Sequence, residues 1–296
     1  MKKTIGFLRL MRPANVVTSI SDVLAGIAIS GFFTGWPFDY TEISDVLMLC
    51  LATAGLYGGG VVFNDVFDAD LDRIERPERP IPSGDISLLQ AIFLGSVLLV
   101  LGVYAAFQPN LTTGILAIAI AASALVYDKW GKHHKILGPL NMGMCRGLNL
   151  LLGISILQDA LDKWWFIACV PIIYIASITM ISRGEVHGSN RTPLYAAAVL
   201  YALVIGFILY FASINGMAMF AIIFLIFLAW MIYRPLFRAI NEPSGPNIGK
   251  AVKAGVIALI IMNSAWAAAA GALEAAIFII LLLPLSFWLA KIFAVT

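Results

Sequence analysis

Long apolar runs, broken by short polar segments, repeat along almost the whole chain. A helix needs roughly 20 consecutive apolar residues to cross a bilayer, and ten runs have about this length. We expect transmembrane helices near residues 14–33, 45–64, 88–107, 111–127, 138–157, 164–182, 193–213, 216–233, 248–270 and 273–293. The pattern therefore predicts an all-α integral membrane protein with a bundle of nine or ten transmembrane helices.

Composition supports a lipid environment. Of the 296 residues, 61% are hydrophobic and 12% are charged, whereas soluble domains carry about 25% charged residues. Each polar segment is too short to form an extramembrane domain. We expect one transmembrane domain over residues 1–296, with membrane lipid as its surroundings and no nucleic acid as a partner.

The basic residues give an orientation. With ten spans, both termini lie on the same side of the membrane, and that side holds all of the 19 Lys and Arg residues except Lys163 and Arg146. Basic loops stay in the cytoplasm. We therefore predict a multi-pass protein of the plasma membrane (the inner membrane of a bacterium) with both termini cytoplasmic. A nine-span alternative merges the last two runs, but residues 251–290 are too long for one helix.

The cytoplasmic end of the second span carries an acidic cluster. At about 100° per residue, Asn64, Asp65, Asp68 and Asp72 share a sector of about 100°, and Asp70 faces the other way. Ionisable groups at membrane depth are costly and mark functional sites. Carboxylates that repel one another need either protons or a cation, and Mg²⁺ prefers such hard oxygen ligands and also binds substrate phosphates.

Basic candidates surround this cluster in the sequence. Arg76 and Arg79 lie in a proline-rich loop directly after it. They either bind phosphate oxygens or follow the positive-inside rule; the sequence leaves both open. Another cytoplasmic loop contains Tyr127, Lys129 and Lys132, and its lysines would bind phosphate as point charges.

Arg146 lies inside the fifth span and needs an anionic partner there. That partner is either Asp22 of the first span or a bound diphosphate. Both remain open from the sequence.

The run from Asn64 to Asp72 (NDVFDADLD), followed by Arg76 to Gly84 (RPERPIPSG), resembles the first aspartate-rich motif of the UbiA superfamily of intramembrane prenyltransferases. Arg12-Pro13 at the head of the first span and the loop with Tyr127 and Lys129 agree with this resemblance. The chain is also similar to a UbiA-like subgroup labelled EboC.

The resemblance implies a helical bundle around a lipid-open cavity, in which two aspartate-rich motifs hold Mg²⁺ and an isoprenyl diphosphate. It implies transfer of the isoprenyl group to an aromatic or other lipophilic acceptor. The residues that would bind metal and take part in catalysis are Asp65, Asp68, Asp72 and Glu185. The residues that would bind substrate are Asn64, Arg76, Arg79, Tyr127, Lys129, Lys132 and Arg146.

The chain departs from the family pattern at the second motif. Glu185 is followed by Ser189 or Asn190 where the family has a second carboxylate, and His187 between them is a candidate base. The apparent tenth span is the other departure, and we expect it to be peripheral.

Three functions remain open from the sequence. The first is a Mg²⁺-dependent prenyltransferase. The second is a UbiA-type terpene cyclase, in which the cation is quenched within its own chain. The third is a non-catalytic binder or transport helper for isoprenoid lipids, which the weakened second motif favours.

Overall fold

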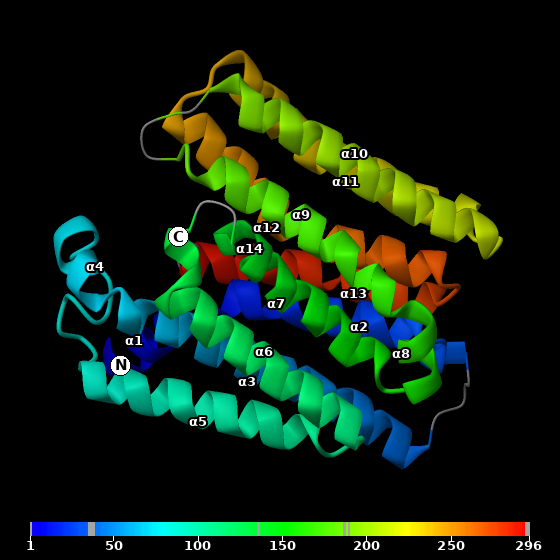
Figure 1. The fold of residues 1–296 in the computed structure, drawn as a ribbon, viewed down its shortest axis with the longest axis horizontal. Coiled ribbons are helices and arrows are strands. Elements are labelled where there is room, and N and C mark those ends of the chain that lie inside the picture. The colour runs from blue at the N-terminus through cyan, green and yellow to red at the C-terminus, as the bar shows by residue number, and fades with distance from the viewer. Residues whose placement is uncertain (1, 35–38, 135–136, 186–187, 189, 294–296) are drawn as a thin grey trace.

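A computed structural model describes residues 2–34, 39–134, 137–185, 188 and 190–293, and it contains helices and no strand within these ranges. The helices form a bundle (Figure 1). Their bounds are α1 Lys2–Met11, α2 Pro13–Ile29, η1 Phe32–Thr34, α3 Tyr40–Phe67, α4 Ala69–Glu75, α5 Leu88–Ala106, α6 Leu111–Lys129, η2 Gly131–His133, α7 Leu137–Ile154, α8 Gln158–Trp164, η3 Trp165–Ala168, α9 Cys169–Ser182, α10 Arg191–Ile214, α11 Ala218–Asn241, α12 Gly245–Ala269, α13 Leu273–Ile280 and α14 Leu282–Ile292.

All ten predicted segments are helical. Among the described residues, eight helices or helix pairs are long and apolar enough to cross a membrane. The other two predicted segments correspond to α2, with 17 residues, and α7, with 18 residues and the buried Arg146. The prediction of an all-helical membrane bundle is confirmed.

The last two apolar runs form separate helices. α12 ends at Ala269, and the chain turns at Gly271, whose φ of +88° suits glycine. The following span comprises α13 and α14. The alternative that merges residues 251–290 into one helix is therefore wrong.

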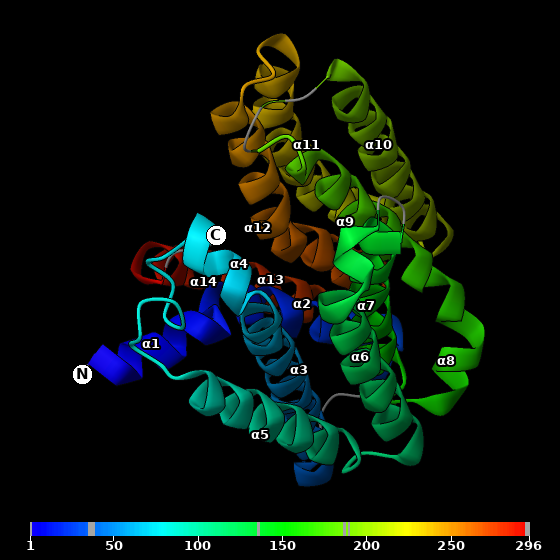
Figure 2. The same ribbon diagram turned by 60° about the vertical axis from the view of Figure 1, so that its left-hand side comes forward.

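The centre of the bundle consists of α2, α7 and α12, which the other helices surround (Figures 1 and 2). α2 crosses α7 at Gly26 and Gly153. A Cβ atom would lie 2.2 Å from the Leu150 carbonyl oxygen at Gly26, and 2.1 Å from the Val23 carbonyl oxygen at Gly153. Small residues allow such a close approach of helices in membranes, so this crossing fixes α2 against α7.

Three consecutive glycines, Gly58 to Gly60, lie in α3. Without side chains, they leave room for a neighbouring helix on one face and for a cavity on the other. A Cβ atom at Gly59 would lie 2.8 Å from the Leu99 side chain of α5. Gly60, in contrast, lines a cavity. One face of α3 therefore packs closely against a helix, and the neighbouring face is open to a ligand.

Polar connections gather at one end of the bundle. Figure 1 shows α1, α4 and the end of α14 at this end, whereas α8 lies at the opposite end. α3 reaches the α4 end at Phe67, where its last residues carry the acidic cluster. The helices thus bring the predicted site together with both terminal helices.

Candidate functional site

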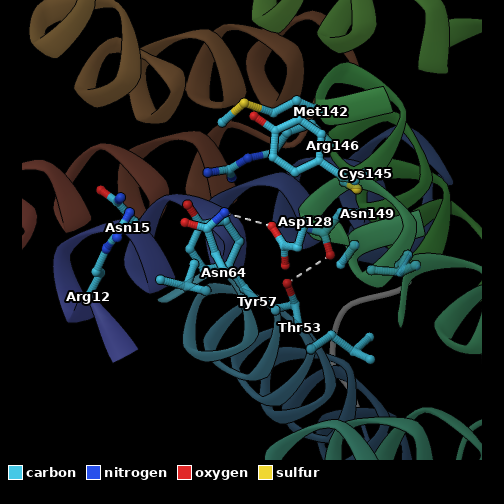
Figure 3. A pocket seen from close by; sticks show the side chains of 16 residues that line it. Arg12, Asn15, Thr53, Tyr57, Asn64, Asp128, Met142, Cys145, Arg146 and Asn149 are labelled. Atoms are coloured by element: carbon cyan, nitrogen blue, oxygen red, sulfur yellow. Dashed lines mark hydrogen bonds between the residues drawn. The ribbon is translucent and has the colours of Figure 1, made fainter. Parts of the chain in front are cut away.

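A cavity of about 250 Å³ opens between α2, α3, α6 and α7 (Figure 3). The surface of its wall is mainly apolar, and Arg12, Asn64, Asp128 and Arg146 are among the polar side chains in it. The lining residues are Arg12, Asn15, Thr53, Leu56, Tyr57, Gly60, Val61, Asn64, Ile120, Ala124, Tyr127, Asp128, Met142, Cys145, Arg146 and Asn149. Among these described residues, none belongs to α13 or α14, in agreement with the expected peripheral place of the last span.

Two carboxylates of the predicted cluster share one guanidinium group. Arg79 Nη1 lies 3.2 Å from Asp65 Oδ1 and 2.7 Å from Asp72 Oδ2. Arg12 Nη2 donates to the same Asp65 oxygen at 2.7 Å. Asp65 and Asp72 are both buried, so the positive charges offset the cost of holding two carboxylates away from water.

Asp68 forms the junction between two helices. With φ −89° and ψ 0°, it ends α3 and begins α4. Its carboxylate forms an ion pair with Lys132, which lies after α6. Asp70, predicted to face the other way, is exposed and pairs only with Arg73 among the described residues, at 2.9 Å. The structure thus keeps Asp65, Asp68 and Asp72 on one side, although α3 does not continue through them.

Arg12 approaches Asp65 through an unusual backbone turn. It has φ +48° and is the one non-glycine residue with positive φ in the described ranges. It directly precedes Pro13, which begins α2. Left-handed backbone in a non-glycine residue costs of order 1–3 kcal/mol and clusters at functional sites.

Asp128 and Asn64 extend the polar group into the cavity. The Asn64 amide donates to Asp128 Oδ1 at 2.9 Å, and Asp128 is 4% exposed. We did not predict Asp128 as a site residue. The sequence feature that could have identified it is a carboxylate next to Tyr127, at the end of a predicted transmembrane helix.

Arg146 has a protein partner. Its guanidinium donates to Asp22 Oδ2 at 2.7 Å and to Thr18 at 2.8 Å, and it lies over the Tyr57 ring. Asn149 also donates to Asp22, at 3.2 Å. Of the two partners left open by the sequence, Asp22 is present in this structure.

The remaining predicted residues lie around the rim. Tyr127 lines the cavity. Lys129 is exposed, with its ammonium group 4.6 Å from the centre of the Trp130 ring. Its neighbour Lys132 contacts the aspartate cluster instead.

The degenerate second motif is described only in part. Burial raises the pKa of the Glu185 carboxyl, and the positive charge of Arg76 opposes that shift. Glu185 and Arg76 therefore influence each other at the α4 end. His187 lies outside the described residues.

The site matches a divalent cation in its donor chemistry. No three His, Cys, Asp or Glu side chains within the described ranges are placed to hold a metal ion. However, Mg²⁺ at phosphate sites usually uses one or two carboxylates together with substrate phosphates. The Arg79 nitrogen lies 3.2 Å from Asp65 and 2.7 Å from Asp72, so these two carboxylates face a common position that holds a positive charge and are the pair that a divalent cation would use.

A family model described as the UbiA prenyltransferase family matches residues 23–246. A protein named digeranylgeranylglyceryl phosphate synthase from Methanosarcina mazei is 30% identical over 71% of this chain and 81% of its own length. One with the same name from Saccharolobus solfataricus is 29% identical over 59% of each chain, so this chain aligns with less than two thirds of that relative. None of these descriptions carries the EboC label, and that subgroup stays a prediction.

Solved structures share the fold. A UbiA homolog from Aeropyrum pernix K1 superposes with a TM-score of 0.68 at 18% identity, covering 84% of this chain and 96% of that chain. A UbiA homolog from Archaeoglobus fulgidus bound to GPP and Mg²⁺ gives 0.60 at 15% identity, covering 84% and 99%. A structure of digeranylgeranylglyceryl phosphate synthase gives 0.67 at 23% identity, covering 93% and 100%.

Proposed function

Because this chain belongs to the UbiA prenyltransferase family, we propose that it transfers an isoprenyl group from an isoprenyl diphosphate to a lipophilic acceptor within the membrane, with Mg²⁺ as cofactor. One observation carries the proposal. Three buried or half-buried carboxylates and three cationic side chains from separate segments form one cluster, and Arg12 of this cluster also lines a largely apolar cavity. Such a cavity suits a molecule with a charged head and a hydrocarbon tail.

The relatives support the donor and the metal. The Archaeoglobus fulgidus homolog, which shares the fold, was solved with GPP and Mg²⁺. In this chain Asp65 and Asp72 would hold the ion, with Asp68 beside them. The bound ion would stabilise the negative charge that develops on the leaving diphosphate.

The cationic side chains take the diphosphate. Arg12, Arg79 and Lys132 lie within reach of the carboxylates, and arginine forks match phosphate oxygens. As the bond between the allylic carbon and the diphosphate oxygen breaks, these side chains stabilise the departing anion. Leu56, Val61 and Ile120 line the cavity beyond them and limit the access of water to the carbocation.

Two kinds of acceptor are compatible with the proposed transfer. We predict an aromatic ring from the family resemblance. The relatives named digeranylgeranylglyceryl phosphate synthase instead suggest a glyceryl phosphate lipid. Both acceptors are lipophilic and enter from the membrane.

We further propose that residues 1–296 form one domain and that the α4 end faces the cytoplasm. The basic residues of the connecting segments support this orientation. The substrate would then bind from the cytoplasmic side.

Diphosphate release by the purified protein in nanodiscs tests the function. Geranyl, farnesyl and geranylgeranyl diphosphates are supplied with Mg²⁺ or with EDTA, and with or without a membrane lipid extract. We expect release that requires both Mg²⁺ and the extract, together with a prenylated lipid product. Release without the extract would favour the cyclase. Binding without release under any condition would favour the non-catalytic binder.

A further inference from the structure

Asp128 lines the cavity but has no role in the proposed metal and diphosphate binding. It lies in the last turn of α6 and is almost wholly buried. Among the described residues that line the cavity, it is the one Asp or Glu. Figure 3 shows its carboxylate beside the open space, with one oxygen bonded to Asn64.

The partner of Asp128 differs in kind from those of the other buried carboxylates. Asp22, Asp65 and Asp72 each accept from an arginine. Asp128 accepts from the neutral amide of Asn64, and no ion pair joins it to a described Lys or Arg side chain. A buried carboxylate that forms no ion pair is a better proton acceptor than a paired one, because no bonded cation stabilises its charged form; the positive charges of Lys132 and Arg12 act on Asp128 only from a greater distance.

Asp128 also lies at the right depth for the reaction. The reacting allylic carbon is bonded to a diphosphate oxygen, so it lies next to the groups that hold the diphosphate. Asn64 immediately precedes Asp65 in α3 and brings Asp128 close to that place. Reacting atoms approach to about 3–3.5 Å, so the nucleophilic atom of the acceptor and its proton reach the same part of the cavity.

We propose that Asp128 receives the proton that the acceptor loses on prenylation; this rests on the proposed transferase function. The bond between the allylic carbon and the diphosphate oxygen breaks, and its electron pair leaves with the diphosphate. The hydroxyl oxygen or ring carbon of the acceptor forms the new bond to the allylic carbon. The acceptor's proton moves to a carboxylate oxygen of Asp128 and later leaves to water.

Two other assignments compete with this role. In the first alternative, Asp128 has only a structural role and orients the Asn64 side chain through their hydrogen bond. In the second alternative, the leaving diphosphate accepts the proton that the acceptor loses, and Asp128 has no catalytic role. The three cases differ in substrate affinity, product formation and response to an added base.

Asp128→Asn keeps an oxygen that accepts from Asn64 but removes the basic group. We assay the full-length variant in nanodiscs with geranylgeranyl diphosphate, Mg²⁺ and the membrane lipid extract. Because general base catalysis contributes typically 10²–10⁴-fold, we expect prenylated product to form at least about 100-fold more slowly, with the affinity for geranylgeranyl diphosphate within about twofold of wild type. Asp70→Asn, which removes an exposed carboxylate from α4, is the matched control and should leave the rate unchanged.

Asp128→Ala adds a readout that a purely structural role would not move. Sodium formate should restore part of the rate in this variant, and sodium chloride at the same concentration should not. Product formation by Asp128→Asn at the wild-type rate would overturn the proposal and assign the proton to the diphosphate. A parallel loss of affinity and rate, without formate rescue, would also overturn it and leave Asp128 as a support for Asn64. If the wild-type protein forms no prenylated product, the transferase function itself fails and this proposal fails with it.

Discussion

The ion pair between Asp22 and Arg146 makes a quantitative prediction about stability. It joins α2 to α7 at 2.7 Å, with side chains that are 2% and 8% exposed. Asp22 also accepts from Asn149 and, at 2.8 Å, from Asn263 of α12. The three central helices therefore share one buried anion.

Replacing Arg146 with Met keeps an unbranched side chain but removes the guanidinium group and its charge. Asp22 then remains buried with neutral donors alone. Breaking a buried ion pair from one side costs about 3–5 kcal/mol, because the other charge loses its compensation. Adding Asp22→Asn removes that charge, so the double variant should be more stable than Arg146→Met by about 1–3 kcal/mol.

The exposed pair of Arg73 and Asp70 serves as the control. Its side chains are 65% and 93% exposed at a separation of 2.9 Å, and exposed pairs contribute about 0–1 kcal/mol. Arg73→Met should therefore hardly change stability. The free energy of unfolding is measured by titration with denaturing detergent in mixed micelles, followed by circular dichroism.

The same variants test whether Arg146 serves the diphosphate instead. Arg146 already contacts Asp22, Thr18 and Tyr57, so we expect its loss to lower the free energy of unfolding more than it lowers the affinity for the diphosphate. An Arg146→Met protein that unfolds within 1 kcal/mol of wild type but binds geranylgeranyl diphosphate much more weakly would refute this reasoning.

Three further predictions follow from other parts of the molecule. Asp68→Asn should reduce turnover at least about 100-fold, because its carboxylate lies beside the proposed metal pair, while circular dichroism shows a folded protein; unchanged turnover would remove Asp68 from the site. Gly153→Ala should destabilise the protein by at least about 1–3 kcal/mol through overpacking against α2, whereas Gly206→Ala, where a Cβ atom meets nothing within 4 Å, should not; equal thermal stability of the two variants would contradict the close crossing. Single cysteines at positions 3 and 291 should both react with an impermeant thiol reagent only from the cytoplasmic side, and labelling from opposite sides would contradict an even number of spans.

Apolar run length predicted the helical type of all ten long segments, because a spanning helix needs an unbroken apolar stretch, but eight candidate spans meet the length and hydropathy that a spanning helix needs within the described residues. It predicted their ends less well. The run at 45–64 lies inside α3, which extends from Tyr40 to Phe67. Asp39 and Glu42 form a capping box before the apolar run begins, and capping depends on polar residues that a hydropathy pattern treats as loop.

The acidic part of the site was predictable because its residues are neighbours in one segment. The pairs that Arg12 and Asp128 form with this segment were not predictable. Arg12 is 53 positions from Asp65, and Asp128 is 64 positions from Asn64. These pairs depend on how α2 and α6 pack against α3, which local periodicity does not specify.

The choice between the two partners of Arg146 has the same origin. Asp22 and Arg146 meet because α2 and α7 cross at Gly26 and Gly153. Shifting either helix by one residue would turn its polar side chain by about 100° and separate the pair. The sequence indicated two possible partners for Arg146, Asp22 and a diphosphate. The close helix crossing at the two glycines brings Asp22 within hydrogen-bonding distance.

The ion pairs at the site also explain why the proposed function would require a metal. Asp65, Asp68 and Asp72 are matched by Arg12, Arg79 and Lys132, so three negative charges already face three positive ones. A diphosphate that entered alone could bind these cations only by leaving buried carboxylates uncompensated, which is costly. If a divalent cation enters with the diphosphate, the carboxylates can pair with the ion and the basic side chains become free to bind phosphate oxygens. The same three basic residues would then stabilise the carboxylates before substrate binding and the leaving group after it.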